Sequence, residues 1–162
     1  MILESFFNWL QQTDLATAIR EGTSAFPWIE SVHVLAITSV VGTIAIVDLR
    51  LMGLTSRDRP ISQIMAEVLP FTRWAFAVAA VTGLLLFASH SHDYVHKAPF
   101  LAKMILLAVA LVNIIVFHGL TARGIAAWDT SPKVPMMVRL AGSGSLALWA
   151  AIVACGRWIG FV

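Results

Sequence analysis

The stretch from Phe26 to Leu54 constrains the fold most, because it is long and overwhelmingly apolar yet carries Glu30, His33 and Asp48. As a helix rising about 1.5 Å per residue it is roughly 40 Å long, more than the ~30 Å hydrocarbon core of a bilayer. At about 100° per residue the three ionisable side chains fall within one broad stripe. Because such groups are costly at membrane depth, we expect this stripe to face protein or a cavity.

Three further apolar segments follow, separated by charged or proline-containing connections. The chain has 162 residues, of which 59% are hydrophobic and 12% charged, too apolar for a soluble domain of this size. The pattern predicts an all-α integral-membrane four-helix bundle, with a short surface helix that ends at Pro70. The expected surface helix covers residues 61–69, and the expected spans cover about 27–51, 72–89, 99–120 and 139–158.

Residues 1–25 form an amphipathic interfacial segment in this interpretation, and residues 26–162 form the transmembrane bundle. Glu4 stands where a signal peptide carries basic residues, so we do not expect a cleaved leader. Thr13 and Asp14 are suitable caps for a second short helix that extends towards Arg20. One face of the first helix is apolar, as in helices that lie in a membrane interface, and it comprises Ile2, Leu3, Phe6, Phe7 and Leu10.

The basic residues predict an orientation. Seven of the eleven lie in the segments that join spans one to two and three to four, which are then cytoplasmic. We therefore expect a multi-pass protein of the bacterial inner membrane with both termini outside the cytoplasm. The net charge of +2 is too small to indicate nucleic acid as a partner. The seven are Arg50, Arg57, Arg59, Arg73, Arg123, Lys133 and Arg139, and the other four are Arg20, Lys97, Lys103 and Arg157.

The histidines suggest a haem b site. His33 lies at membrane depth on the inward stripe, and axial ligands of haem commonly project from facing helices of a bundle. His90 is the best-placed second ligand because span two ends there, and His96 is the next. Gly83 falls within about 20° of His90 on a helical wheel, where it leaves room for a flat macrocycle or simply allows close helix packing.

The same histidines also suggest copper or zinc. Imidazole suits both metals, and the candidate ligands are His33, His90, His92 and His96, with Asp93 as a ligand or a hydrogen-bond partner of one. The spacing matches no specific motif, so a solvated loop is the competing interpretation.

A possible inner polar site comprises Asp48, Arg50, Arg73 and His118. It could hold a proton or a quinone head group, or it could be a helix end that reaches lipid headgroups. His118 has no second histidine at its depth, so we favour a structural hydrogen bond for it and do not expect a second bis-histidine haem.

The stretches FPWIESVHVLAITSVVGTIAIVDLRLMGL and HKAPFLAKMILLAVALVNIIVFH resemble a family of small bacterial membrane proteins of unknown function. Four spans with inward histidines are also similar in architecture to small b-type cytochromes, such as the cytochrome b561 group and the membrane anchors of respiratory dehydrogenases. That likeness implies a cytochrome that passes electrons between a periplasmic or membrane partner and the quinone pool.

Two alternatives remain: a non-redox accessory subunit of a larger membrane complex, and a copper- or zinc-handling membrane protein. The expected partners are membrane lipid and either another redox subunit or a second copy of the chain. No nucleophile motif is present, and the single cysteine, Cys155, excludes an internal disulfide. We therefore expect an electron-transfer subunit and no self-contained hydrolytic enzyme.

Overall fold

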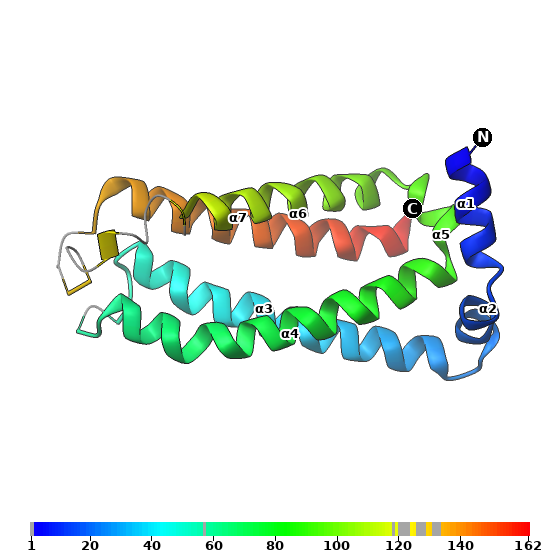
Figure 1. Ribbon diagram of the computed structural model, residues 1–162, viewed down its shortest axis with the longest axis horizontal. Coiled ribbons are helices and arrows are strands. Elements are labelled where there is room, and N and C mark those ends of the chain that lie inside the picture. Colours follow the sequence, from blue (N-terminus) through cyan, green and yellow to red (C-terminus); the bar gives the residue numbers. More distant parts are fainter. Residues whose placement is uncertain (1, 57, 118, 120–123, 126–128, 131–133) are drawn as a thin grey trace.

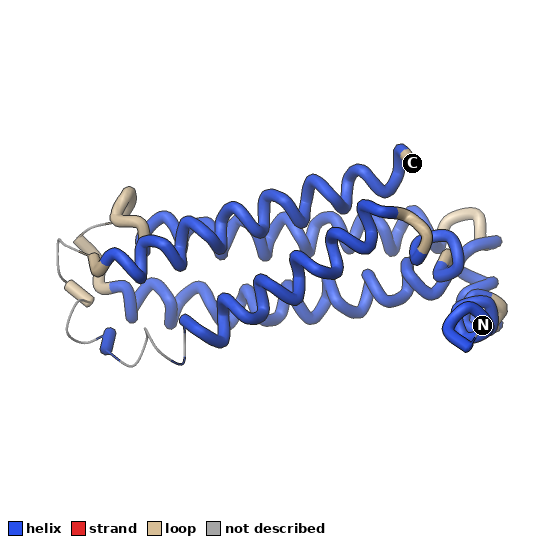
Figure 2. Tube along the Cα trace, turned by 90° about the horizontal axis from the view of Figure 1, so that it is seen from above, coloured by secondary structure: helices blue, strands red, loops and turns tan. Residues whose placement is uncertain are grey.

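Four long helices lie side by side in the computed structural model of the chain (Figures 1 and 2). The structure describes residues 2–56, 58–117, 119, 124–125, 129–130 and 134–162. Each of the four helices is long and apolar enough to cross a membrane, which confirms the all-α four-span prediction. They are α3 (Ala25–Leu51), α4 (Ile61–Ser89), α6 (Ala98–Val116) and α7 (Met136–Trp158), the last continued by the 3₁₀ turn η3 (Ile159–Phe161).

The four helices form two antiparallel hairpins. α3 packs along α4, and α6 packs along α7, while contacts between α3 and α7 join the hairpins into one bundle (Figure 1). We call the end of the bundle at which α3 ends and α4 begins the loop end. The opposite end carries the short helix α5 (Ser91–Val95), and we call it the α5 end.

Local chemistry explains where α3 ends. Gly53 follows the last turn with φ +74°, a conformation that a residue without Cβ adopts at no steric cost. Its N–H donates to the Arg50 carbonyl and the Leu54 N–H donates to the Leu49 carbonyl, both at 2.9 Å. This paired bonding satisfies carbonyls that the helix end would otherwise leave without donors.

α4 differs from the prediction, because Pro70 does not end a separate surface helix. The helix runs without interruption from Ile61 to Ser89 with an exposed Pro70 inside it. Proline removes a single backbone donor, and neighbouring groups in a membrane bundle can compensate for that loss. The polar connection at residues 90–97 contains the single-turn helix α5.

Two short helices cross the α5 end of the bundle, namely α1 (Ile2–Gln11) and α2 (Asp14–Glu21) (Figure 1). The Thr13 hydroxyl accepts from the Ala16 N–H, which confirms Thr13 as the cap of α2. The Arg20 guanidinium donates to the Gln11 carbonyl at 2.9 Å and to the Ser89 carbonyl at 3.3 Å. The exposed apolar side chains of α1, as expected of an interfacial helix, include Ile2, Leu3, Phe6 and Trp9.

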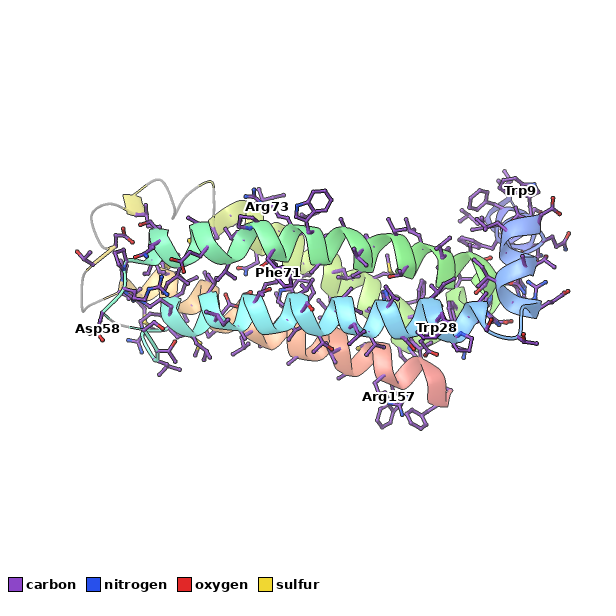
Figure 3. All side chains as sticks on the ribbon, turned by 90° about the horizontal axis from the view of Figure 1, so that it is seen from below. Trp9, Trp28, Asp58, Phe71, Arg73 and Arg157 are labelled. Atoms are coloured by element: carbon purple, nitrogen blue, oxygen red, sulfur yellow. The ribbon has the colours of Figure 1, made fainter. Side chains whose placement is uncertain are left out.

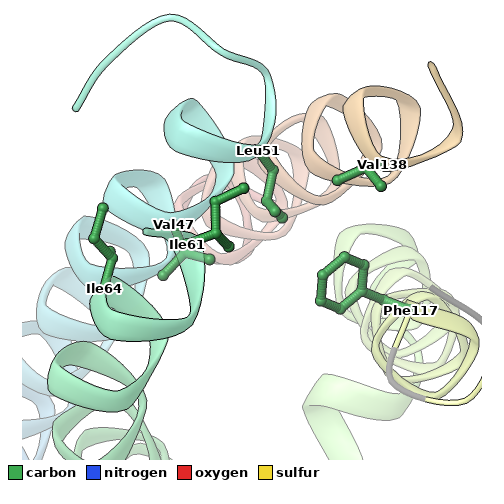
Figure 4. Packing of buried hydrophobic residues seen from close by; sticks show 6 residues of the cluster. All are labelled: Val47, Leu51, Ile61, Ile64, Phe117 and Val138. Carbon is green, nitrogen blue, oxygen red and sulfur yellow. The ribbon is translucent and has the colours of Figure 1, made fainter. Parts of the chain in front are cut away.

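Two apolar clusters hold the bundle together. The cluster at the loop end joins α3, α4, Phe117 and α7 (Figure 4). The cluster in the middle contains at least one buried residue from each of the four long helices. The first comprises Val47, Leu51, Ile61, Ile64, Phe117 and Val138, and the second comprises Val40, Ala75, Ala110, Trp149 and Ile152.

Candidate functional site

A cavity of about 700 Å³ lies between the four long helices on the α5 side of the middle cluster. Its size falls within the roughly 300–1,000 Å³ of typical ligand pockets. Its wall is mostly apolar, with Ile37 and Val41 from α3, Leu86 and Phe87 from α4, and Phe100 from α6. Further lining residues on α3 and α7 are exposed on the bundle surface, so the cavity opens sideways between these helices; they are Val34, Thr38, Gly42 and Val153.

His33 lines the cavity from α3, and hydrogen bonds to Thr82 and to the backbone of Ala79 hold its ring against α4. Its Nδ1 lies 2.9 Å from the Thr82 hydroxyl on α4. That hydroxyl donates its own hydrogen to the Val78 carbonyl at 2.7 Å, so we assign the shared hydrogen to Nδ1 of His33. In this tautomer Nε2 has no hydrogen and keeps its lone pair, the form in which imidazole binds a metal.

Gly83 provides the space in which the imidazole lies. A Cβ at this position would stand 2.9 Å from Cε1 of His33, closer than real contacts allow. The space expected for a macrocycle at Gly83 is therefore filled in part by the imidazole ring. Gly42 and Gly156 also line the cavity, so three of the four long helices present bare backbone to it.

Of the charged residues of the cavity, only Glu30 was placed on an inward face from the sequence, and the three basic residues were not singled out as site residues. Glu30, Lys97, Lys103 and Arg157 line it together with Tyr94, which gives three cations and one carboxylate. The Lys97 ammonium donates to the Ile159 carbonyl at 3.0 Å, and Lys103 lies beside Gly156 on α7. The sequence contained a sign of this site, because a lysine inside the apolar run of α6 indicates a functional residue.

His90 lies at the turn between α4 and α5, outside the set of residues that line the cavity. Its Nδ1 is 3.0 Å from the Ser89 hydroxyl, and its ring meets those of Phe26 and Tyr94 at 5.3 and 5.9 Å between centroids. Burial lowers the pKa of His90, and the positive charges of Arg20 and Lys97 lower it further against the opposing effect of Asp93.

His92 and His96 lie one helical turn apart at α5, with ring centroids 5.0 Å apart. His96 is exposed and its Nδ1 lies 2.8 Å from the His92 carbonyl oxygen. The Nδ1 of His92 is 3.9 Å from the Asp93 carboxylate. Among the described residues no group of three or more potential metal-ligating side chains assembles, and none of the contacts found there joins His33 to His90, His92 or His96.

The three described residues of the expected inner polar site do not form one cluster. The guanidinium of Arg50 is buried and donates to the carbonyls of Arg59 and Asp129, at 3.0 and 3.4 Å. Arg73 is exposed and points away from the bundle (Figure 3). Asp48 is buried against α7, where Ser145 is its hydrogen-bonding partner. His118 lies outside the described residues.

The four apolar spans and the short helices across one end define a small multi-pass helical membrane protein. The chain belongs to a family of unknown function, DUF6644, whose family model matches residues 6–162. This confirms the resemblance to a family of small membrane proteins without an assigned activity. No curated protein and no solved structure matches the chain.

Proposed function

We propose that the protein is a b-type cytochrome in which the cavity at the α5 end holds one haem, with Nε2 of His33 as an axial ligand. The observation that carries the proposal is the pairing of Nδ1 of His33 with Thr82 at the wall of the cavity; in the tautomer that we assign, Nε2 keeps its lone pair. Ligating histidines in proteins normally donate their other ring N–H to a fixed acceptor, as His33 does to Thr82.

The lining residues fit a haem in three respects. The wall is apolar where the macrocycle would lie, and backbone at Gly42 leaves room for a flat ring. Lys97, Lys103 and Arg157 supply the cations that haem carboxylates require. The haem would supply one-electron chemistry, and the chain would bind it, orient it and keep water away.

His33 is the one histidine among the described residues that line the cavity, so the proposal has a single histidine ligand instead of the expected pair of His33 and His90. The α5 end also carries α1 and α2, whose exposed apolar side chains suit a membrane surface. A partner in the membrane or at this surface would deliver electrons, and the quinone pool would accept them. The lateral opening between α3 and α7 would admit apolar ligands from lipid.

Optical spectroscopy tests this function. The full chain, purified in mild detergent from haem-supplied cells, should show a b-type spectrum that changes on dithionite reduction. His33→Ala should abolish the spectrum, and Thr82→Val should weaken haem binding because it removes the acceptor for Nδ1. His90→Ala is the matched control and should retain haem, since His90 does not line the cavity.

Two results would overturn the proposal: wild-type protein that takes up no haem in cells or from added hemin, and a haem spectrum that survives in His33→Ala. A colourless protein that purifies in a stoichiometric complex would instead favour the non-redox accessory subunit.

A copper- or zinc-handling role is a second candidate, favoured by the exposed pair His92 and His96. Their ring spacing of 5.0 Å allows both to reach one ion, although two imidazoles are fewer ligands than stable sites use. Titration of the purified protein with copper or zinc should then show one equivalent bound, lost in His92→Ala and His96→Ala and kept in His33→Ala. Binding that is unchanged in both α5 variants would exclude this site.

A further inference from the structure

Asp48 is a buried carboxyl near the loop end of α3, in contact with α7. Its exposed fraction is 4%, and its Oδ2 is a buried oxygen without a hydrogen-bond partner. Ser145 on α7 is the polar side chain that reaches this carboxyl. An unpaired buried polar atom is uncommon in folded proteins and calls for a specific reason.

No cation neutralises Asp48 within the part of the chain that the structure describes. Arg50, two residues further along α3, directs its guanidinium to the carbonyls of Arg59 and Asp129. On α7 the nearest basic residue is the exposed Arg139, and on α4 Glu67 pairs with Arg59 while Arg73 is exposed. An ionised carboxylate in this apolar setting would be unpaired, and burial of such a charge is far more costly than burial of the neutral acid.

α3 and α7 pack closely beside Asp48, and the described residues do not supply the ligands that a larger ion needs. A Cβ on Gly142 would stand 3.0 Å from both the backbone oxygen of Asp48 and Cβ of Leu51, so α3 and α7 are in close contact there. A sodium or calcium ion needs several oxygen ligands, and no cluster of acidic side chains forms in the described residues. A proton needs only the carboxyl itself.

We propose that Asp48 is a proton-binding site within the membrane, a carboxyl that is protonated at neutral pH and hydrogen-bonded to Ser145. Asp48 lies roughly 22 Å from His33 along α3, measured as helical rise, so this site is separate from the cavity. The inference does not depend on haem binding, and loss of haem in any variant leaves it intact.

Infrared difference spectroscopy of the full chain in detergent or liposomes tests the inference. The spectrum of wild type minus Asp48→Asn at neutral pH should contain the C=O band of a protonated carboxyl, shifted in heavy water. Glu67→Gln is the matched control, because Glu67 is exposed and paired with Arg59 at 2.6 Å. Its difference spectrum should contain carboxylate bands and no protonated C=O band.

Ser145→Ala provides a second variant if Asp48→Asn does not fold. It keeps the carboxyl and removes its hydrogen-bonding partner, so the C=O band should move to higher frequency. The unfolding temperature of Asp48→Asn should equal or exceed that of wild type, since an amide replaces a neutral acid of the same shape. The inference would be overturned if the difference spectrum of Asp48→Asn or of Ser145→Ala at neutral pH contained carboxylate bands in place of the C=O band.

Discussion

The imidazole of His33 lies against the backbone of α4 at Gly83, where no Cβ would fit. Thr82 and Gly83 are consecutive on α4, so one residue binds Nδ1 while the next provides room for the ring. Neither contact requires a bound cofactor. The orientation of the imidazole that we propose as a haem ligand is therefore already set by the packing of α3 on α4, which is the usual requirement for a functional site.

Gly83→Ala tests this fit directly. The new methyl group would stand 2.9 Å from Cε1 of His33, and we expect a destabilisation of about 1–3 kcal/mol, as for other insertions into packed interiors. Gly144→Ala is the matched control, because no atom lies within 4 Å of its Cβ position and alanine favours helix by up to ~1 kcal/mol. Thermal unfolding in detergent measures both variants, and equal stability of the two would refute this account of Gly83.

Helical periodicity places His33 on an inward face, and the structure agrees that His33 lines a cavity. His90 was chosen because span two ends there, but it does not line that cavity. The helix ends at Ser89, and the backbone of His90, at φ −139° and ψ 37°, turns its ring towards Phe26. Whether the lysines line the cavity depends on how α6 and α7 face α3, and periodicity within one helix does not specify that orientation.

Among the elements, the start of α4 depends on a distant capping residue. Pro60 precedes the helix and makes no side-chain cap. Asp129, from the segment between α6 and α7, accepts from the backbone N–H of Ser62 at 2.8 Å and from its hydroxyl at 2.5 Å. One carboxylate therefore links the two hairpins at the loop end. The sequence could not reveal this link, because capping patterns are recognised between residues close in the chain.

This link should weaken in acid. The hydrogen bonds from the Ser62 side chain and backbone lower the pKa of Asp129, so the folded state gains stability above the ordinary aspartate pKa of about 3.9. That stability is lost as the pH falls through the lower pKa of the folded state. Hydrogen exchange at the first turn of α4 should then accelerate.

Asp129→Ala should produce the same acceleration at neutral pH, with a cost of about 1 kcal/mol, as for loss of other helix caps. Asp58→Ala, at an exposed position of the α3–α4 connection, should leave exchange at α4 unchanged. Equal exchange in the Asp129 variant and wild type would show that the link does not stabilise α4.

The whole molecule has two different ends. The loop end has an apolar cluster, the buried Arg50 and the Asp129 link, whereas the α5 end has the cavity, its cations and the two crossing helices. Spans, fold class and the helical N-terminal segment could be predicted, because apolar length and periodicity are local properties of the chain. The position of the cavity could not, since it depends on how far the two hairpins separate.

Reporter fusions after successive spans test the orientation. The basic residues favour the loop end as cytoplasmic, so a reporter at Asp58 should be active in the cytoplasm, and one at Asp93 should be active on the other side. A fusion at Val162 should behave like the one at Asp93. A cytoplasmic reporter at Asp93 would place the cavity on the cytoplasmic side and exclude a periplasmic electron donor.

The contacts of α1 and α2 also impose an order on biosynthesis. Arg20 bonds to Ser89, the Gln11 side chain accepts from the N–H of His92, and the Ser91 hydroxyl donates to the carbonyl of Phe7. Every one of these partners is synthesised after two complete spans have followed the N-terminal helices. At about 5–20 residues per second, α1 and α2 wait for several seconds before these partners exist. During that interval their exposed apolar side chains face lipid, so the membrane surface holds α1 and α2 until α4 and α5 are made.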